Sequence, residues 1–364
     1  MRLTRVSAGV TGPQTETGGI VSRPAVKVAA FTGGWSVPSA RFRVRQYIPA
    51  LSSLGIEVKE FVSRLGSYPP VYRWARYGWA AATVCERAWS ILRGGAYDLT
   101  VLQREMVSTF VTLEPLTRSP RLLDVDDAIW LRRRGGFARR LAEMCEAVIC
   151  GNSFLAEKFG AWNRNVTVVP TAVDTDRFCP SQNENRGSRD QVICWSGTSG
   201  GYEYLGKVER ALCIVLNECP GTRLRIVSDN PPRFRQIAPH FVEYVPWSPG
   251  VEVSAVQDAA AAIMPLDDSL WSRGKCAYKL LTYMACGVPV VASPVGMNAE
   301  VLRHADVGFA ARTEEEWVDA LKFLLTHPDR AAKMGAAGKQ LIERKYSVRV
   351  LAPILARTLL QYAR

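Results

Sequence analysis

Lys275 and Lys279 stand four residues apart in the segment RGKCAYKLLTYMACGVPVVASPVGMNAEVL, which spans residues 273–302. The pattern predicts a helix over 275–285, with both ammonium groups on one face. Gly274 would let the backbone approach a ligand closely, and the free N–H groups of a first helical turn attract anions. The segment therefore predicts a site for a phosphate or diphosphate, unless the two lysines only form a solvated face.

Short apolar runs alternate with amphipathic stretches along most of the chain, which is typical of a parallel α/β fold. Six candidate strands precede a polar, aperiodic stretch (CPSQNENRGSRD) and six follow it, which predicts two Rossmann-like domains with a cleft between them. The expected divisions are a flexible tail at 1–25, a first domain at 26–178, a linker at 179–190, a second domain at 191–346, and a C-terminal helix at 347–364 that could cross back to the first domain.

Several motifs occur in the order that is typical of one family. They are FTGG at 31–34, VICGNSFL at 148–155, VVPTAVDTDRF at 168–178, SGTSG at 196–200 and YMACGVPVVAS at 283–293. Together they resemble the retaining glycosyltransferases of family 4 (glycosyltransferase group 1), which have the GT-B fold. The resemblance implies that the second domain binds a nucleotide-diphosphate sugar and the first binds a saccharide or lipid-linked acceptor. It also implies transfer with retention, and neither a bound metal nor a cofactor.

The same resemblance indicates which residues would contact the donor. Those expected near the diphosphate or sugar are Gly33, Gly34, Gly197, Thr198, Gly274, Lys275, Lys279 and Glu300, and those expected near the ribose or base are Thr282 and Trp247. Family members commonly carry a Glu-x7-Glu pair, whose positions here are Gly274 and Thr282. A basic pair in the SGTSG loop is also missing, so Lys275 is expected to supply a replacement cation. No residue is assigned as catalytic.

Carboxylates also alternate in the first half, at Asp124, Asp126 and Asp127. Such a pattern can hold Mg²⁺ or Mn²⁺ against phosphates, as in GT-A transferases. That fold would leave the second half of the chain unexplained, so we prefer a structural or acceptor-side role, with Asp127 capping a helix or turn. Arg104 follows the candidate strand 99–103, at the edge where parallel sheets bind ligands. It is expected either to contact the acceptor or to form an internal ion pair.

Charge is distributed unevenly along the chain. The net charge is +12; residues 1–170 hold 23 Lys and Arg against 13 Asp and Glu, whereas the remainder holds 23 against 21. A basic first half predicts an acceptor that is anionic or presented at a membrane, with peripheral contact to anionic lipid. Nucleic acid is not an expected partner, because no recognised binding module is visible.

Composition excludes several other classes of protein. No window approaches ~18 uninterrupted apolar residues, and residues 1–25 lack the apolar core of a signal peptide. Nine scattered cysteines and three separated histidines predict reduced thiols and no metal centre. We therefore expect a cytoplasmic glycosyltransferase of polysaccharide or glycolipid synthesis that could associate with the inner face of the membrane. The alternatives are an inactive nucleotide-sugar-binding protein and a GT-B nucleotide-sugar epimerase.

Overall fold

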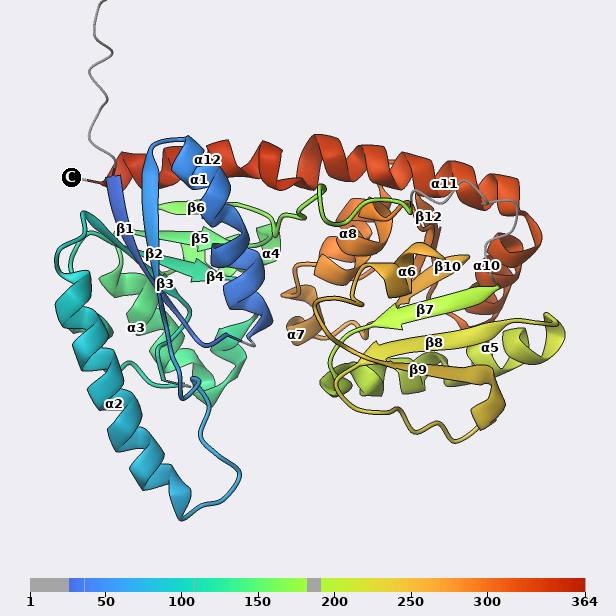
Figure 1. Cartoon of the computed structure of the whole chain (residues 1–364), viewed down its shortest axis with the longest axis horizontal. Helices are drawn as coiled ribbons and strands as arrows, with labels where there is room; N and C mark the ends of the chain where they lie inside the picture. Colours follow the sequence, from blue (N-terminus) through green and yellow to red (C-terminus); the bar gives the residue numbers. More distant parts are fainter. Residues whose placement is uncertain (1–25, 36, 108, 182–190, 364) are drawn as a thin grey trace, which may run out of the picture.

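The computed structural model describes residues 26–35, 37–107, 109–181 and 191–363. The expected tail at 1–25 and most of the expected linker at 179–190 therefore lie outside the described residues. Two six-stranded sheets, each parallel throughout, lie side by side in Figure 1. The α/β fold class and the two sheets predicted from the sequence are confirmed.

The strands follow the apolar runs of the sequence closely. The first sheet has the order β2-β1-β3-β4-β5-β6 and consists of β1 (Val26–Thr32), β2 (Ile56–Val62), β3 (Leu99–Gln103), β4 (Arg121–Val125), β5 (Ala147–Cys150) and β6 (Val166–Val168). The second has the order β12-β11-β10-β7-β8-β9 and consists of β7 (Val192–Ser196), β8 (Arg223–Ser228), β9 (Val242–Pro246), β10 (Ala261–Met264), β11 (Val290–Ala292) and β12 (Gly308–Ala310). Their buried, near-continuous apolar character is typical of parallel strands that are covered on both faces.

Helices cover both sheets. Those of the first half are α1 (Ile48–Ser53), α2 (Ala75–Gly94), α3 (Gly136–Met144) and α4 (Ser153–Gly160). Those of the second half are α5 (Tyr202–Glu218), α6 (Ser254–Gln257), α7 (Leu270–Arg273), α8 (Tyr278–Ala285), α9 (Met297–Leu302), α10 (Glu314–Thr326), α11 (Pro328–Leu341) and α12 (Val348–Tyr362). Within the described residues, no helix is long and apolar enough to cross a membrane.

Strand order fixes where a ligand can bind. The order reverses between β1 and β3 in the first sheet and between β7 and β10 in the second. In open parallel sheets, ligands occupy the crevice beyond the carboxyl ends of the strands at such a reversal. Gly33 and Arg104 follow β1 and β3, whereas Gly197 follows β7 and Lys275 lies beyond β10. The topology therefore gathers residues from distant segments at one edge of each sheet.

The end of the chain joins the two halves. α11 and α12 run across both sheets in Figure 1, with a π-helical turn over Ile342–Tyr346 between them. α12 packs on the first half, where Leu351, Leu355 and Leu359 belong to the same buried cluster as Val28 of β1. The helical run from α11 to α12 therefore begins on the second half and ends on the first.

A buried ion pair organises the carboxyl edge of the first sheet. Arg43 lies in a π-helical turn over Ala40–Val44, and its Nη2 lies 2.7 Å from the Asp124 Oδ2 at the end of β4. The Nη1 of Arg43 also donates to the Val169 carbonyl at 2.7 Å, beyond β6. Both charged side chains are almost inaccessible to solvent. One guanidinium thus ties together three segments that are distant in sequence.

Replacing Arg43 with alanine would leave the Asp124 carboxylate buried and unpaired. We expect the free energy of unfolding of the first half to fall by about 3–5 kcal/mol, measured by urea denaturation. Arg139→Ala is the matched control, because Arg139 pairs with Glu143 at 2.7 Å and both side chains are largely exposed, and exposed pairs contribute about 1 kcal/mol or less. Equal losses in the two variants would contradict this account.

Candidate functional site

The segment after α7 forms a close contact between the two halves. A Cβ atom on Gly274 would lie 2.7 Å from the Cβ of Ala128, beyond β4. The Asn152 side-chain amide, at the start of α4, donates to the carbonyl oxygens of Gly274 and Lys275, both at 3.1 Å. The Cys276 thiol donates to the Asp126 carbonyl at 3.2 Å. Gly274 therefore permits a close approach of the first half to the second.

The local structure around the two lysines differs from the sequence prediction. α8 begins at Tyr278 rather than Lys275, because Ala277 adopts a left-handed conformation (φ 51°). Lys275 therefore precedes the helix and does not share a helical face with Lys279. Its Nζ lies 5.4 Å from the ring centroid of Trp271 in α7. The two lysines are held by different local structures.

Lys279 extends beneath the loop that follows β7. Its Nζ lies 4.3 Å from the ring centroid of Trp195, and a Cβ atom on Gly197 would overlap that nitrogen. Burial, and secondarily the charge of Lys275, lower the pKa of Lys279 to about 7. In the part of the chain that the structure describes, no carboxylate lies within ion-pair distance of either ammonium group. The site thus holds two uncompensated cationic side chains.

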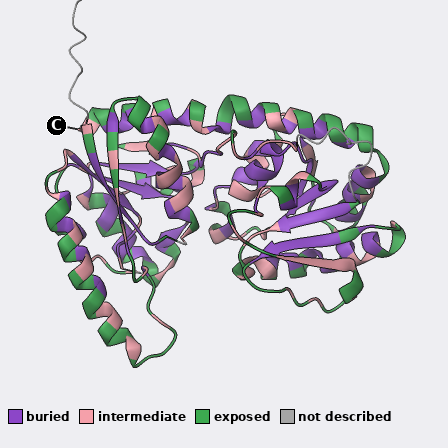
Figure 2. Cartoon of the chain, in the orientation of Figure 1, coloured by how far each residue is buried: buried purple, intermediate pink, exposed green. Residues whose placement is uncertain are grey.

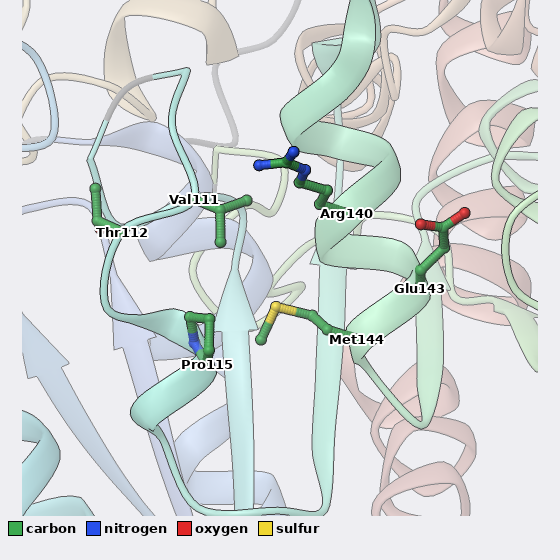
Figure 3. Close-up of a pocket in the computed structure, with 6 residues that line it drawn as sticks. All are labelled: Val111, Thr112, Pro115, Arg140, Glu143 and Met144. Carbon is green, nitrogen blue, oxygen red and sulfur yellow. The ribbon is translucent and has the colours of Figure 1, made fainter.

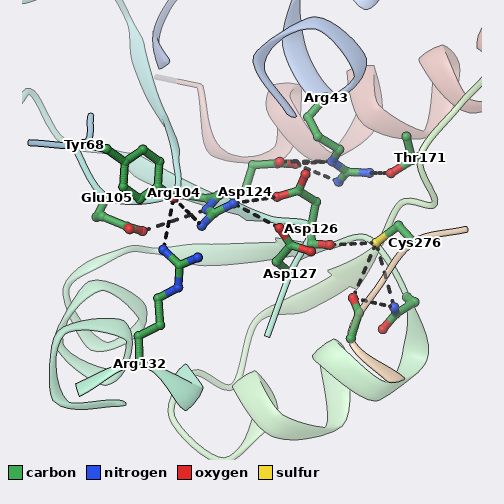
Figure 4. A network of polar contacts seen from close by, with 12 residues as sticks. Arg43, Tyr68, Arg104, Glu105, Asp124, Asp126, Asp127, Arg132, Thr171 and Cys276 are labelled. Carbon is green, nitrogen blue, oxygen red and sulfur yellow. Dashed lines mark hydrogen bonds and ion pairs between the residues drawn. The ribbon is translucent and has the colours of Figure 1, made fainter. Parts of the chain in front are cut away.

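The opposite wall of the site is an ion network around Arg104 (Figure 4). Arg104 directly follows β3 and has a positive φ of 63°, which is costly for a residue with a side chain. Its Nη1 lies 3.1 Å from Asp127 and 4.0 Å from Asp126, and its Nε lies 3.9 Å from Glu105. Asp127 therefore forms an ion pair. It does not cap a helix, because the turn that follows has no side-chain cap and begins after Ala128.

Asp127 faces charges from both halves of the molecule. Burial and the neighbouring Asp126 carboxylate raise its pKa to about 6, while Arg104, Lys275 and Arg132 act in the opposite direction. The Arg132 guanidinium lies 5.4 Å from the Trp271 ring, which also contacts Lys275. Arg132 of the first half and Lys275 of the second half therefore meet at one aromatic ring.

The alternating carboxylates after β4 do not converge on one point. Asp124 turns to Arg43, whereas Asp127 turns to Arg104 (Figure 4). Among the described residues, no three His, Cys, Asp or Glu side chains are grouped so that they could hold a metal ion. Asp124 and Asp127 thus have different arginine partners, and Asp126 lies 4.0 Å from the same arginine as Asp127.

Two further residues that are expected to contact the nucleotide sugar lie in the second half. The Thr282 hydroxyl donates to the Lys279 carbonyl at 2.8 Å within α8, and Thr282 is buried. Glu300, in α9, accepts a hydrogen bond from the Ser153 hydroxyl of α4 at 2.7 Å. Glu300 thus lies at the contact between the halves, where a ligand hydroxyl would compete with Ser153.

The remaining expected residues lie around the rim. Gly33 and Gly34 follow β1, and a Cβ on Gly33 would lie 2.9 Å from the Ser67 hydroxyl oxygen. Thr198 lies in the β7 loop, next to Ser199, whose backbone N–H donates to Asp229 at 2.6 Å. Trp247 follows β9 and is 38% exposed beneath the Arg41 guanidinium, which is 5.1 Å from the ring. It is therefore accessible rather than a core tryptophan.

Sequence reasoning missed four residues of this site: Trp195, Trp271, Arg132 and Asn152. Trp271 is four residues before Lys275 and Arg132 is five after Asp127, so proximity to these candidates was an available signal. Nothing in the sequence pairs Asn152 with the carbonyl groups of the second half, because that contact depends on how the halves meet.

A pocket of about 520 Å³ lies elsewhere, between α3 and the segment after β3 (Figure 3). Its lining is formed by Val111, Thr112, Pro115, Arg140, Glu143 and Met144. None of the expected site residues lines it, and it contains no cluster of charges comparable with that around Lys275. The chemistry indicated by the sequence belongs to the contact between the two halves.

Comparison with known proteins shows which family model and which folds the chain is similar to. Residues 201–327 match the family model described as Glycosyl transferases group 1. A GDP-mannose-dependent alpha-(1-6)-phosphatidylinositol monomannoside mannosyltransferase of Mycobacterium tuberculosis is 26% identical over 243 residues, which cover 60% of this chain and 62% of that protein. The chain thus matches less than two thirds of the length of this curated relative.

Solved structures extend the likeness to nearly the whole chain. Sucrose-phosphate synthase of Thermosynechococcus elongatus has a TM-score of 0.68 at 15% identity, over 92% of this chain and 98% of its own. The Anabaena protein HepE, in complex with UDP and glucose, has a TM-score of 0.66 at 15% identity, over 92% and 99%. The chain therefore has the GT-B fold, and residues 201–327 within it match the model of the glycosyl transferases group 1.

Proposed function

We propose that this protein transfers a sugar, with retention of anomeric configuration, from a nucleotide-diphosphate sugar to an acceptor hydroxyl. The observation that carries the proposal is the pair of uncompensated ammonium groups, Lys275 and Lys279, at the carboxyl edge of a GT-B sheet. A diphosphate supplies the anionic charge that this site lacks. The relative from Mycobacterium tuberculosis is named for GDP-mannose, and HepE is solved with UDP, which supports a donor of this class.

The leaving diphosphate is the group that the site must stabilise. Charge develops on it as the bond to the sugar breaks, and preorganised cations in a water-poor site lower the energy of that state. Lys275 and Lys279 approach from the second half, and Arg132 approaches from the first. We place the sugar between these cations and Glu300, with Thr282 and Trp247 toward the ribose and base.

Asp127 is the acceptor-side carboxylate in this proposal. It belongs to the first half, is partly exposed, and faces Lys275 across the contact. An ionised carboxylate can accept a hydrogen bond from an acceptor hydroxyl and orient its oxygen toward the sugar. Arg104 holds this side chain from behind at 3.1 Å, which fixes its direction.

α2 supplies a surface that suits an acceptor presented by a membrane. In Figures 1 and 2 this helix projects from the first half and is mostly exposed. Large apolar side chains at its two ends are unusually accessible, with Trp74 81%, Tyr77 86% and Leu92 74% exposed. Arg73 and Arg76 lie beside the first two. Aromatic and basic residues together favour the interface of an anionic membrane. We therefore place the protein in cytoplasmic glycolipid or polysaccharide synthesis, at the membrane surface.

Lys275→Met should weaken donor binding. Calorimetric titration at pH 6.5 with UDP-glucose and with GDP-mannose should show binding of at least one, and loss of the Lys275 charge should cost about 1.5–3 kcal/mol. Lys339→Met is the matched control, since that lysine lies on α11 and pairs only with Glu343 in the same helical region. Equal affinities in the wild type and Lys275→Met would argue against this placement of the diphosphate.

Asp127→Asn should reduce turnover while leaving donor affinity nearly unchanged. Nucleotide release from the bound donor, with phosphatidylinositol vesicles as acceptor, should slow by roughly 100-fold. The wild-type rate should decline as the pH falls through about 6, where Asp127 becomes protonated, and the variant should lack that decline. Asp176→Asn, at an exposed ion pair, is the control. If the rate of Asp127→Asn still declined as the pH fell through about 6, this role would be excluded. If the wild type bound the donor without any turnover, the alternative of an inactive nucleotide-sugar-binding protein would be favoured.

Anionic vesicles should sediment with the protein in a salt-sensitive manner. Replacing Trp74 and Tyr77 with serine should reduce the bound fraction several-fold, because both the apolar and the interfacial contacts are lost. Leu360→Ser, at an exposed position of α12, should have no effect. Binding that is unaffected by the paired substitution would show that α2 is not the membrane-facing surface.

A further inference from the structure

Lys279 occupies a space that depends on two glycines. A side chain at Gly197 would overlap its Nζ, and a Cβ on Gly201 would lie 3.6 Å from the same atom. The Trp195 ring closes the space from below, because its atoms lie 2.9 Å from the Cβ positions of both glycines. The ammonium group is thereby held directly beneath the backbone that follows β7.

Within the described ranges, the surroundings of Lys279 offer it no carboxylate at ion-pair distance. On its own helix, the Tyr283 hydroxyl is already bound to the backbone of Ser196. The segment before that helix contributes the Lys275 ammonium, which disfavours a second positive charge. Beyond the β7 loop, Asp229 is bound to the backbone N–H and hydroxyl of Ser199.

α5 begins beside this space, after Gly201, and its Tyr204 ring faces Lys275 rather than Lys279, at 5.7 Å. Its phenol is neutral at physiological pH, because burial raises the pKa of Tyr204 further. An ammonium group in such surroundings loses hydration without gaining an ion pair, and the neutral amine is favoured as the pH rises above about 7. Without a ligand, Lys279 is therefore a neutral amine above a pH of about 7, and binding of an anion would favour its protonated form.

We propose that Lys279 is the diphosphate ligand beneath the Gly197 loop and that it takes up one proton from solvent when the donor binds. The proton adds to the Nζ lone pair, and the resulting ammonium pairs with a phosphate oxygen. This inference rests on the proposed function, because it needs a nucleotide-diphosphate sugar as the ligand. The inference adds a pH dependence to that function. The affinity for the sugar donor and the release of the nucleotide product would both depend on the protonation of Lys279.

The direction of this pH dependence follows from the thermodynamic linkage between proton binding and binding of the nucleotide sugar. A bound dianionic diphosphate raises the pKa of Lys279, so the complex holds more protons than the empty site above pH 7. Donor affinity should therefore be constant at low pH and fall by up to about tenfold per pH unit above 7. Both phosphates of a nucleotide sugar are esterified, so the ligand itself does not titrate in this range.

Calorimetry in two buffers of different ionisation enthalpy measures the proton directly. We would titrate the full chain with UDP-glucose and with GDP-mannose at pH 6 and pH 8. A Lys279 pKa of about 7 in the empty site predicts uptake of about 0.9 proton at pH 8 and about 0.1 at pH 6. Binding at pH 8 with no proton uptake would overturn the inference while leaving the proposed function intact.

Variants of the two lysines separate this role from a general loss of charge. Lys279→Met should abolish the uptake and weaken binding at pH 6 by at least tenfold. Lys275→Met should retain the uptake but shift it to higher pH, because the repulsion from Lys275 is removed. Full uptake in Lys279→Met would contradict the assignment. If neither probe binds the wild type at either pH, the proposed function itself fails, and the inference fails with it.

The melting temperature shows whether Lys279→Met is folded and provides an independent readout. In the unfolded chain this lysine is protonated up to its ordinary pKa. In the folded protein without a ligand it is protonated only below a pH of about 7. Removing the ammonium should therefore raise the melting temperature of the empty protein more at pH 6 than at pH 9. A variant that melts well below the wild type at pH 6 would contradict the desolvated state of Lys279.

Discussion

Uncompensated positive charge at the contact between two parallel sheets is the feature on which this structure depends. Lys275 and Lys279 approach from the second half, and neither meets a carboxylate at ion-pair distance among the described residues. Burying the ammonium group of Lys279 without a partner is unfavourable in the absence of a ligand. The rest of the architecture explains how this unfavourable arrangement is maintained. Two carboxyl edges face each other, the helical run from α11 to α12 connects the second half to the first, and Gly274 lets the halves touch.

The two walls of the site differ in how their charged side chains are paired. The wall from the first half is internally neutralised, because Arg43 and Arg104 are each paired with a specific aspartate. The wall from the second half leaves its lysines unpaired against tryptophan rings. An anionic ligand is therefore favoured on the second side, and Asp127 is the carboxylate that remains accessible on the first. This asymmetry matches a donor diphosphate on one side and an acceptor hydroxyl on the other.

Local patterns in the sequence were sufficient to predict the two sheets and the segment that carries the lysines. Buried parallel strands appear as short apolar runs, and the linker has a distinct polar composition. The start of α8 was not predictable in this way, because the left-handed Ala277 lies where Cys276 packs against Gly151 of the other half. The pairing of Arg104 with Asp127 and the position of Lys279 beneath Gly197 are likewise tertiary contacts. Residue types were thus enough to predict candidate residues, which stay a prediction, whereas their geometry depends on how the two halves meet.

A crystal structure of the chain with a bound nucleotide sugar would test the central claim most directly. The account predicts that the diphosphate lies between the Gly197 loop and the ammonium groups of Lys275 and Lys279, with the sugar directed toward Glu300 and Asp127. A diphosphate bound outside this contact, or one with both lysines still unpaired, would contradict it.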